Sequence, residues 1–512
     1  MKILTAESMR AAEELSVKQG LGWIRLMENA GSAAARVIRS HFEVTNKKIV
    51  VVVSHGNNGG DGYVVARKLK ENGCTVNIIR IGGTPKTPTA MEMLAMAKDV
   101  GAEIVDFESS NQFSYDLIMN SDIIVDAIFG TGFSGELTEP FGTIIEQINM
   151  SPAAVVSLDL PSGCIANSSL VGKHCINADI TIAFCALKPC HVLLPAADSC
   201  GKIYPVSIGM PESSLDLQTA VMTSIEKDYI AVNLPKRHKN SNKGSFGTAS
   251  LICGSYGMAG AAVIAAKAAI RSGVGIAKLI IPDKIYNIVA ANVLEAVCCP
   301  LSSTADGTLS YANASRVINE INLSSAAAIG CGLGKGYDVN AMVESIIKCA
   351  KVPLVIDADG INAIASRIDI IKQCNSPVIL TPHPGEAARI LNCTAEDIQN
   401  DRLGSAKKIA ALSGAITVLK GANTLIATPS GEVSVCLFGN AGMATAGAGD
   451  MLTGVIAALL AQGLDSQKAA VCGVGIHALS GDFALKTVSD ISMSPLDMID
   501  SLSSLFLNLQ GR

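Results

Sequence analysis

Short runs of β-branched and other apolar residues alternate with stretches of helical length along most of this 512-residue chain, and this alternation restricts the possible folds more than any other feature. In the first half, for example, IVVVV at residues 49–53 precedes a helix-like stretch at 61–73, and the next apolar run, VNIIRI, follows at 76–81. Strands that are separated by helices pair in parallel, and the helices cover the faces of the sheet. The chain is therefore predicted to have an α/β fold with mostly parallel sheets.

The alternation runs from about residue 49 to residue 209, stops, and returns from residue 248. The segment between residues 209 and 248 lacks this alternation. Its part PKRHKNSNKGSFG, at residues 235–247, is polar and basic, which is typical of a linker or an exposed loop. At about 150 residues per domain, the length allows three domains or two large ones. We place a domain boundary near residue 220 and predict two α/β domains, at residues 1–215 and 225–510.

The composition excludes several other classes of protein. The 40 Lys and Arg residues nearly balance the 45 Asp and Glu residues, for a net charge of −5, which argues against a nucleic-acid binder. Charged residues make up only 17% of the chain, against about 25% in typical domains, which fits extensive buried sheets. The 15 cysteines include no CxxC pair and match neither a disulfide framework nor a zinc cluster.

The amino terminus and the longest uncharged stretch bear on the location of the protein. Residues 7–14 contain one arginine and three glutamates where a signal peptide needs an apolar stretch, so we interpret this segment as a surface helix of a cytoplasmic protein. The 23 residues between Lys243 and Lys267 carry no charge, but nine of them are Gly, Ser or Thr, which divide the stretch. No membrane segment is predicted.

Three glycine-containing loops follow predicted strands in the first half, at the edge of the sheet where parallel strands bind ligands. The loop GNNGGDG at residues 56–62 opens a helix, so its N–H groups can approach a phosphate; a tight connection without a ligand is an equal alternative. Asp126 begins the segment DAIFGTGFSGE, and Asp159 begins DLPSG. Either Asp alone is more often a turn former or a helix cap, but three such loops on one edge favour acid/base chemistry or a cation site.

These residues, together with ALKPCH at 186–191, resemble the N-terminal domain of the YjeF family, the NAD(P)HX epimerases, over about residues 1–215. The resemblance implies a Rossmann-like three-layer αβα domain, with Asp159 as the acid/base group at C6 of the hydrated nicotinamide ring. It implies substrate contacts by Asn57, Asn58, Gly59, Gly60, Asp61, Gly130, Thr131, Gly132, Phe133, Ser134, Gly135, Glu136 and Asp159. It also implies a potassium ion on Asn58, Asp126 and Ser162, whose amide, carboxylate and hydroxyl oxygens suit a hard cation.

Two features of this half stay open at the level of the sequence. Lys188, which precedes a proline, is either a helper of Asp159 or an exposed lysine, and the sequence favours neither. Residues 164–169 read CIANSS, where members of the family often have an acidic stretch that contains Asp. This departure concerns the details of the loop and leaves the predicted site unchanged.

A glycine-rich loop before an apolar helix is the strongest local signal in the second half. Residues 439–450, GNAGMATAGAGD, precede MLTGVIAALLAQ, and such a loop offers backbone N–H groups to anionic oxygens. Asp450, in the first turn of the predicted helix, is expected to stay ionised and to point toward a substrate hydroxyl; a plain helix cap is the weaker alternative. The segment resembles the GAGD signature of ribokinase-like small-molecule kinases, whose Asp takes the proton of the hydroxyl that is phosphorylated.

Further motifs make the second half resemble the C-terminal domain of the same YjeF family, the NAD(P)HX dehydratase, over about residues 225–510. They are CGLG at 331–334, VIDADG at 355–360, HPGEAAR at 383–389 and KGANT at 420–424. The resemblance implies a ribokinase-like α/β domain in which the hydrated dinucleotide contacts Gly332, His383, Pro384, Gly385, Glu386, Ala387, Ala388, Arg389 and Asp450. It implies an adenine nucleotide, with Mg²⁺ bridging its phosphates, on Lys420, Gly421, Ala422, Asn423, Thr424, Asn440, Ala441, Gly442, Met443, Ala444, Thr445, Ala446, Gly447, Ala448 and Gly449.

Some of these residues also have plain structural interpretations. Taken singly, His383 between two prolines is more often a structural loop histidine, and Asp357 or Asp359 is more often a turn at a strand end. Cys331 stands where the family usually has Pro, so this turn is expected to be looser. We expect Lys420 to be a point charge for phosphate.

The sequence therefore predicts an enzyme with two activities that repairs NADHX and NADPHX, the hydrated forms of NADH and NADPH. The first domain would interconvert the R and S epimers, and the second would dehydrate the S form, with ADP as the expected nucleotide and ATP as the alternative. One rival is a kinase of a vitamin precursor with a non-catalytic N-terminal domain, and another is a scaffold like related domains of eukaryotic RNA-decay proteins. We expect a homo-oligomer that binds no nucleic acid.

Overall fold

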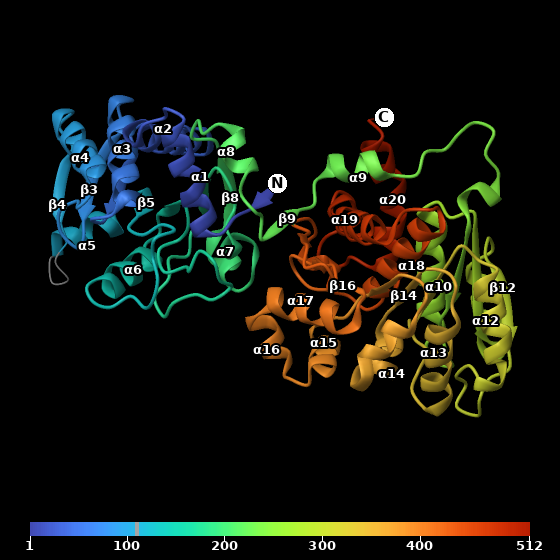
Figure 1. The fold of residues 1–512 in the computed structure, drawn as a ribbon. Coiled ribbons are helices and arrows are strands. Elements are labelled where there is room, and N and C mark those ends of the chain that lie inside the picture. The colour runs from blue at the N-terminus through green and yellow to red at the C-terminus, as the bar shows by residue number, and fades with distance from the viewer. Residues whose placement is uncertain (108–111, 512) are drawn as a thin grey trace. The chain divides into compact units, whose positions relative to one another are not determined.

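The computed structural model describes residues 1–107 and 112–511, and the chain forms two units, Met1–Met222 and Thr223–Arg512 (Figure 1). Parallel strands and helices alternate in both units, so the predicted α/β fold class is confirmed. Among the described residues, no helix combines the length and the apolarity that a membrane crossing requires.

The first unit is built on a sheet of seven strands that all run parallel. The strands are β2 (Lys48–Val53), β3 (Thr75–Arg80), β4 (Glu103–Asp106), β5 (Ile123–Ala127), β6 (Ala154–Leu158), β7 (Ile180–Phe184) and β8 (Lys202–Val206). Their order is β4-β3-β2-β5-β6-β7-β8, so the strand order reverses between β2 and β5. In open α/β sheets a ligand binds at the carboxyl ends beside such a reversal.

The central strand β2 shows why helices cover both faces of this sheet. Val51 and Val53 pack into one core with four helices, while Val50 and Val52 pack into a second core with two others, because side chains alternate along a strand. The first group consists of α1 (Ala6–Lys18), α2 (Trp23–His41), α3 (Asn57–Glu71) and α4 (Pro88–Asp99), and the second of α5 (Gln112–Met119) and α6 (Phe141–Met150). The unit therefore has three layers. Short helices α7 (Pro189–Val192) and α8 (Glu212–Asp216) complete it.

The second unit contains a longer, mixed sheet. Its strands are β9 (Met222–Ser224), β10 (Thr248–Ile252), β11 (Ile276–Pro282), β12 (Val297–Leu301), β13 (Ala326–Ile329), β14 (Leu354–Ile356), β15 (Val378–Leu380), β16 (Ile416–Leu419), β17 (Leu425–Ala427) and β18 (Val433–Val435). They lie in the order β9-β18-β17-β16-β15-β14-β13-β10-β11-β12. The pairs from β12 to β16 are parallel, whereas β17 runs antiparallel to both of its neighbours.

Six helices pack with one face of this sheet in a single large core. They are α9 (Lys227–Asn233), α10 (Ala259–Arg271), α11 (Tyr286–Asn292), α18 (Ala448–Ala461), α19 (Ser466–Ala484) and α20 (Pro495–Leu509). The remaining helices of the unit are α12 (Ala314–Asn322), α13 (Tyr337–Cys349), α14 (Ala358–Ile364), α15 (Pro384–Leu391), α16 (Ala395–Asn400) and α17 (Arg402–Ser413). Helix α10 buries most of its alanines.

Helix α18, which begins with the predicted Asp450 motif, lies directly against α10. At Gly454 the two backbones come so close that an added Cβ would stand 2.2 Å from the carbonyl oxygen of Ala265 and 3.0 Å from the Cβ of Ala268. Only glycine fits at this crossing. The close approach holds the first turn of α18, and with it Asp450, in a defined place.

We expect Gly454→Ala to destabilise the second unit by about 2 kcal/mol, because overpacking against a backbone oxygen lies at the upper end of the roughly 1–3 kcal/mol range and the better helix propensity of Ala returns only about 1 kcal/mol. Hydrogen exchange of α10 and α18 amides in the full chain measures this change. Gly260→Ala is the matched control, since an added Cβ there meets nothing within 4 Å. Equal protection in the two variants would contradict the packing argument.

Candidate active sites

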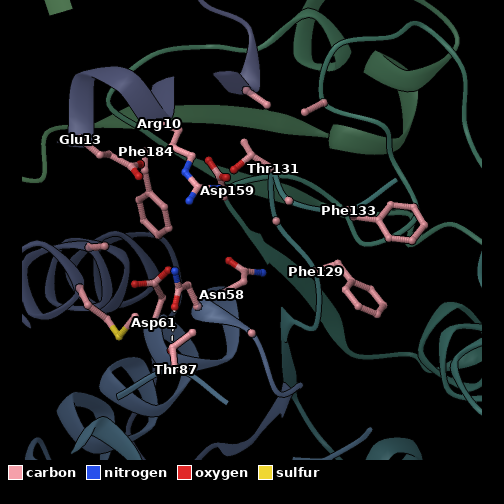
Figure 2. Close-up of a pocket in the computed structure, with 18 of the residues that line it drawn as sticks. Arg10, Glu13, Asn58, Asp61, Thr87, Phe129, Thr131, Phe133, Asp159 and Phe184 are labelled. Carbon is pink, nitrogen blue, oxygen red and sulfur yellow. Dashed lines mark hydrogen bonds between the residues drawn. The ribbon is translucent and has the colours of Figure 1, made fainter. Parts of the chain in front are cut away.

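A cavity of about 1120 Å³ opens at the carboxyl ends of the strands in the first unit (Figure 2). The loops that follow β2, β5, β6 and β7 contribute to its wall, beside the reversal of strand order. The volume exceeds the roughly 300–1,000 Å³ of most small-molecule sites, so the cavity has room for an extended ligand.

Most of the predicted epimerase residues line this cavity. They are Asn57, Asn58, Asp61, Gly130, Thr131, Gly132, Phe133, Ser134 and Asp159. Gly59, Gly60, Gly135 and Glu136 do not line it. An added Cβ at Gly59 would stand 2.1 Å from the carbonyl oxygen of Ser54, and one at Gly60 would stand 2.5 Å from the sulfur of Met27, so these two glycines let α3 pack closely.

Asp159 forms a buried ion pair with Lys188. Lys188 Nζ lies 2.5 Å from Asp159 Oδ1, and the two side chains are only 1% and 10% exposed. Lys188 also donates to the carbonyl oxygen of Phe184, at 3.1 Å. The alternative that Lys188 is an exposed lysine is therefore wrong, because the loop after β7 turns its side chain inward to meet the carboxylate.

The backbone around this ion pair is held by His191. Its Nδ1 accepts a hydrogen bond from the N–H of Lys188 at 3.0 Å, which leaves Nε2 to donate to the carbonyl oxygen of Asp159 at 2.8 Å. Burial lowers the pKa of His191 to about 4, so the ring is neutral and fits this pattern. Asp159 itself has a left-handed backbone, with φ of 65°, which is uncommon for a residue other than glycine.

Asp126 lies beneath the cavity and is completely buried. Its carboxylate accepts hydrogen bonds from the hydroxyls of Ser157 and Ser162, at 2.8 and 2.6 Å, and from the N–H groups of Ser162 and Ile128. Burial still raises the pKa of Asp126 above its usual value, although these bonds lower it. The predicted cation ligands Asp126 and Ser162 are thus in contact, and the buried amide nitrogen of Asn58 has no hydrogen-bond partner among the residues that the structure describes.

The first helix also contributes to this site, which its sequence does not predict. Arg10 and Glu13 of α1 line the cavity (Figure 2), and so does Trp23 at the start of α2. The acids of this helix resemble those of a surface helix, and the only signal to the contrary is their spacing along the helix. Burial, with Asp159 as the next cause, raises the pKa of Glu13 to about 7. Asp61 is more deeply buried, and its pKa lies well above the usual value.

In the second unit, the predicted motifs also follow the carboxyl ends of parallel strands. The CGLG turn follows β13, Asp357 follows β14, His383 follows β15 and Lys420 follows β16. Asp357 is 1% exposed, and its Oδ1 lies 2.6 Å from Lys420 Nζ. Thr453 of α18 donates its hydroxyl to Asp357 Oδ2, at 2.9 Å. Asp357 is therefore more than a turn at a strand end, because it binds the start of α18 to the sheet.

Lys420 lies among three residues of the second unit, which are Asp357, Glu386 and Gly449. Burial alone would lower its pKa, but Asp357 and Glu386 raise it above the usual value, so its ammonium stays charged. An added Cβ at Gly449 would lie 3.4 Å from Lys420 Nζ. The glycine thus leaves open space beside the ammonium, at the first turn of α18.

Asp450 is the third residue of α18, whose N-cap Gly447 has a left-handed conformation with φ of 91°. Burial, with Asp357 as the next cause, raises the pKa of Asp450 to about 6. Ligand atoms of Cys331, Asp357 and Asp450 all lie within 4.8 Å of one another. The predicted catalytic group is therefore close to the buried ion pair and ionised near neutral pH.

The segment at residues 383–389 caps and begins α15. His383 Nδ1 accepts a hydrogen bond from the N–H of Gly385, and the backbone N–H of His383 donates to the carboxylate of Glu386 at 2.8 Å. His383 is therefore a helix cap, and its ring is half exposed. Ala387 and Ala388 bury their side chains, which leaves only their backbone for a ligand. Arg389 is exposed and donates to Asn362. Pro384 occupies the first turn.

Gly332 and the two predicted nucleotide loops have constrained backbones. An added Cβ at Gly332 would stand 2.9 Å from that of Ala261, so this turn lies against α10. Arg402 is buried beneath Lys420 and Gly421 and donates to the carbonyl oxygen of Lys420. In the second loop, Asp482 accepts from the N–H of Gly439 and from the side chain of Asn440. Residues 421–424 and 440–449 stay predicted nucleotide contacts.

The first unit has a parallel sheet of the YjeF type. The second has an acidic residue behind a glycine loop at the start of an apolar helix. Together they define a two-domain α/β enzyme with a ribokinase-like second domain. The family described as YjeF-related protein N-terminus matches residues 24–190, and the family described as NAD(P)H-hydrate dehydratase matches residues 249–504. The second unit is similar to the crystal structure of the ADP/ATP-dependent NAD(P)H-hydrate dehydratase from Bacillus subtilis, co-crystallised with ATP and Mg²⁺. That match has 30% identity and a TM-score of 0.50, and it covers 56% of this chain and 99% of the other.

Relatives that span the whole chain carry both domains. The bifunctional NAD(P)H-hydrate repair enzyme Nnr of Moorella thermoacetica is 35% identical, over 100% of this chain and 97% of its own. The Nnr of Escherichia coli is 33% identical, over 97% of this chain and 92% of its own. The chain therefore belongs to the family of bifunctional NAD(P)H-hydrate repair enzymes, and the resemblance inferred from its motifs is confirmed.

The buried ion pair of the first unit leads to a stability prediction. We expect Lys188→Met to destabilise this unit by about 3 kcal/mol, because removal of one partner leaves an uncompensated buried carboxylate. The double variant Lys188→Met/Asp159→Asn should recover most of this loss, since no lone charge stays buried. Hydrogen exchange of β6 and β7 amides measures the stability of both variants, with Lys98→Met, at an exposed position of α4, as the control. A single variant as stable as the control would contradict the pairing.

Proposed function

We propose that this chain repairs hydrated NADH and NADPH, with one step in each unit. The first unit interconverts the R and S epimers of NAD(P)HX, and the second dehydrates the S form with the help of an adenine nucleotide. The observation that carries this conclusion is the full-length match to bifunctional repair enzymes, in a chain that retains an acidic strand-end site in each unit. One chain with both activities can recover either epimer.

In the first unit, Asp159 is the proposed acid/base group at C6 of the hydrated ring. Its Oδ1 is paired with Lys188, which leaves Oδ2 near Gly130 at the cavity wall, where an added Cβ would stand 3.4 Å from it. Asn57 and Asn58 are the first two residues of α3, so their N–H groups lie at the positive end of the helix dipole. This end of the cavity suits the pyrophosphate of the dinucleotide.

The residues at the base of this cavity fit the predicted potassium ion. Asp126 and Ser162 offer carboxylate and hydroxyl oxygens in contact with each other. The amide oxygen of Asn58 lies beside Gly130, where an added Cβ would stand 3.3 Å from it, so the missing side chain of this glycine leaves room for an ion at that oxygen. When bound, the ion supplies positive charge that attracts the anionic substrate.

In the second unit, the charged side chains and the glycines beside them fit a nucleotide with Mg²⁺. Lys420 Nζ faces the open space at Gly449, and Asp357 would provide a carboxylate of the kind that Mg²⁺ uses beside phosphate oxygens, which leaves Asp450 for the substrate. The glycines of residues 439–449 present backbone N–H groups to phosphates. The bound ion neutralises phosphate charge. ADP is the proposed nucleotide, with ATP as the alternative.

The chemistry of the second step follows from the position of Asp450. As an ionised carboxylate, it takes the proton of the C6 hydroxyl while the oxygen accepts a phosphoryl group from the nucleotide, as in ribokinase-like kinases. The C6–O bond then breaks with phosphate as the leaving group, and loss of a proton from C5 restores the dihydropyridine ring. The second unit thus uses the anion site of a kinase for an elimination.

The rival functions fit the chain less well. A vitamin-precursor kinase leaves the first unit, with its ion pair and its large cavity, without a role. A scaffold has no use for the buried carboxylates at either site. Self-association and a cytoplasmic location stay predictions.

The dehydratase step is tested by recovery of reduced-nicotinamide absorbance from NAD(P)HX with ADP or ATP and Mg²⁺. We expect Asp450→Asn to lower the rate at least 100-fold, because the amide cannot accept the hydroxyl proton. The wild-type rate should rise with pH through about 6 and then level off, since the base is inactive while protonated. No recovery by the wild type with either nucleotide would rule out this function.

The epimerase step is tested separately. We expect Asp159→Asn to abolish the enzyme-dependent interconversion of R and S forms, while the S form is still dehydrated at the wild-type rate. Chromatographic separation of the epimers in the absence of nucleotide measures the interconversion. Recovery of absorbance in the presence of nucleotide measures the dehydration of the S form. Loss of both activities would contradict the assignment of Asp159 to a separate site.

A further inference from the structure

The first helix contributes charged groups to the epimerase cavity although it lies outside the family match, which begins at residue 24. Arg10 and Glu13 of α1 line the cavity on the same side as Asp159 and Thr131, while Asp61 and Asn58 lie across from them (Figure 2). Nothing in the motifs of the family assigns a role to Glu13. Its position at the cavity is a property of how this helix is docked.

Several contacts hold α1 in place at this cavity. Asn167 accepts the N–H of Ala6 at 2.7 Å and donates to both carboxylate oxygens of Glu7, at 3.0 and 2.8 Å. The residues before α1 are tied to the loop that carries Lys188, because the N–H of Leu4 donates to the carbonyl oxygen of Leu187 at 2.9 Å. The helix is therefore anchored at its start to two loops of the site.

The surroundings of Glu13 leave its carboxyl available for proton transfer. Among residues 1–107 and 112–511, no hydrogen bond or ion pair involves this side chain, although it is partly buried. Its pKa is raised to about 7 by burial first and then by Asp159, while Lys188 and Arg10 lower it and Glu14 raises it slightly. Asp61 of α3 is the remaining charged group that interacts with it. A large part of Glu13 is thus protonated near neutral pH.

We propose that Glu13 is a second proton-transfer group of the epimerase, which acts together with Asp159 on the C6 hydroxyl of the hydrated ring. This inference rests on the proposed epimerase function. Two carboxyl groups in different surroundings can divide the acid and the base role, and here one is free in the cavity while the other is bound to a lysine.

The step balances without any further reactant. Glu13 donates its proton to the C6 hydroxyl, the C6–O bond breaks with help from the lone pair of N1, and water and a ring iminium result. Although both carboxyls lie across from Asp61 and Asn58, they come from different elements, α1 and the loop after β6, and the ring would be held with C6 between them. Water then adds to the face of C6 that Asp159 approaches, opposite to the departing hydroxyl, and Asp159 takes the proton that the adding water releases. Proton exchange with solvent returns both carboxyls to their starting states, and the reverse sequence converts the other epimer.

The test compares Glu13→Gln with wild type in the nucleotide-free interconversion of separated R and S forms. We expect kcat to fall about 100-fold or more with KM changed less than threefold, because the amide keeps the shape but cannot donate a proton in this way. In wild type, kcat should fall as pH rises through about 7, since Glu13 then loses its proton. In Glu13→Gln this alkaline limb should disappear, whereas Glu13→Asp should retain it.

Glu14→Gln is the matched control, since Glu14 lies on the same helix, is half exposed and does not line the cavity. We expect its rate to match that of wild type and its alkaline limb to persist, displaced slightly to lower pH because Glu14 also raises the pKa of Glu13. A Glu13→Gln variant with a kcat within threefold of wild type would overturn the proposal, and so would a slow variant that keeps the alkaline limb. Dehydration of the S form by the same variants reports the proposed function independently, so its failure is distinguishable from failure of Glu13.

Discussion

Each unit depends on a lysine that crosses from one strand end to neutralise a buried carboxylate at another. In the first unit this pair is Lys188 with Asp159, and in the second it is Lys420 with Asp357, at 2.5 and 2.6 Å. An isolated charge is too costly to bury, so each pair fixes two loops at a distance that only the correct strand order allows. The remaining polar groups are arranged around these pairs: His191 holds the backbone of one, and Thr453 ties α18 to the other.

This constraint explains the composition of the chain. Few charges are present overall, because both sheets are covered by helices and most of the buried charges lie near the strand ends. The glycines serve two separate purposes. Some, such as Gly59 and Gly454, allow helices to approach a strand or another helix, while Gly449 leaves space beside a charged side chain. Motif glycines are therefore not equivalent as ligand contacts, although they look alike in the sequence.

The sequence predicted the loops of both sites well and their partners poorly. Asp159 and Asp450 were identified because strand-end loops with glycine have a recognisable pattern, and the structure places both in clusters of titratable groups. The pairing of Asp159 with Lys188 could not be predicted, since the two residues are 29 positions apart and an isolated lysine before a proline is usually exposed. The role of α1 at the cavity was missed because its acids resemble those of any surface helix.

The sequence by itself determined the α/β class, the family and the strand-end loops, because these follow from local periodicity and from short motifs whose residues are adjacent in the chain. Only the tertiary structure decided which charges pair, which glycines face a ligand and which helix closes the cavity. These properties depend on distances between residues far apart in the sequence. Burial then sets the protonation of groups such as Glu13 and Asp450, because desolvation acts only once the chain has folded around them.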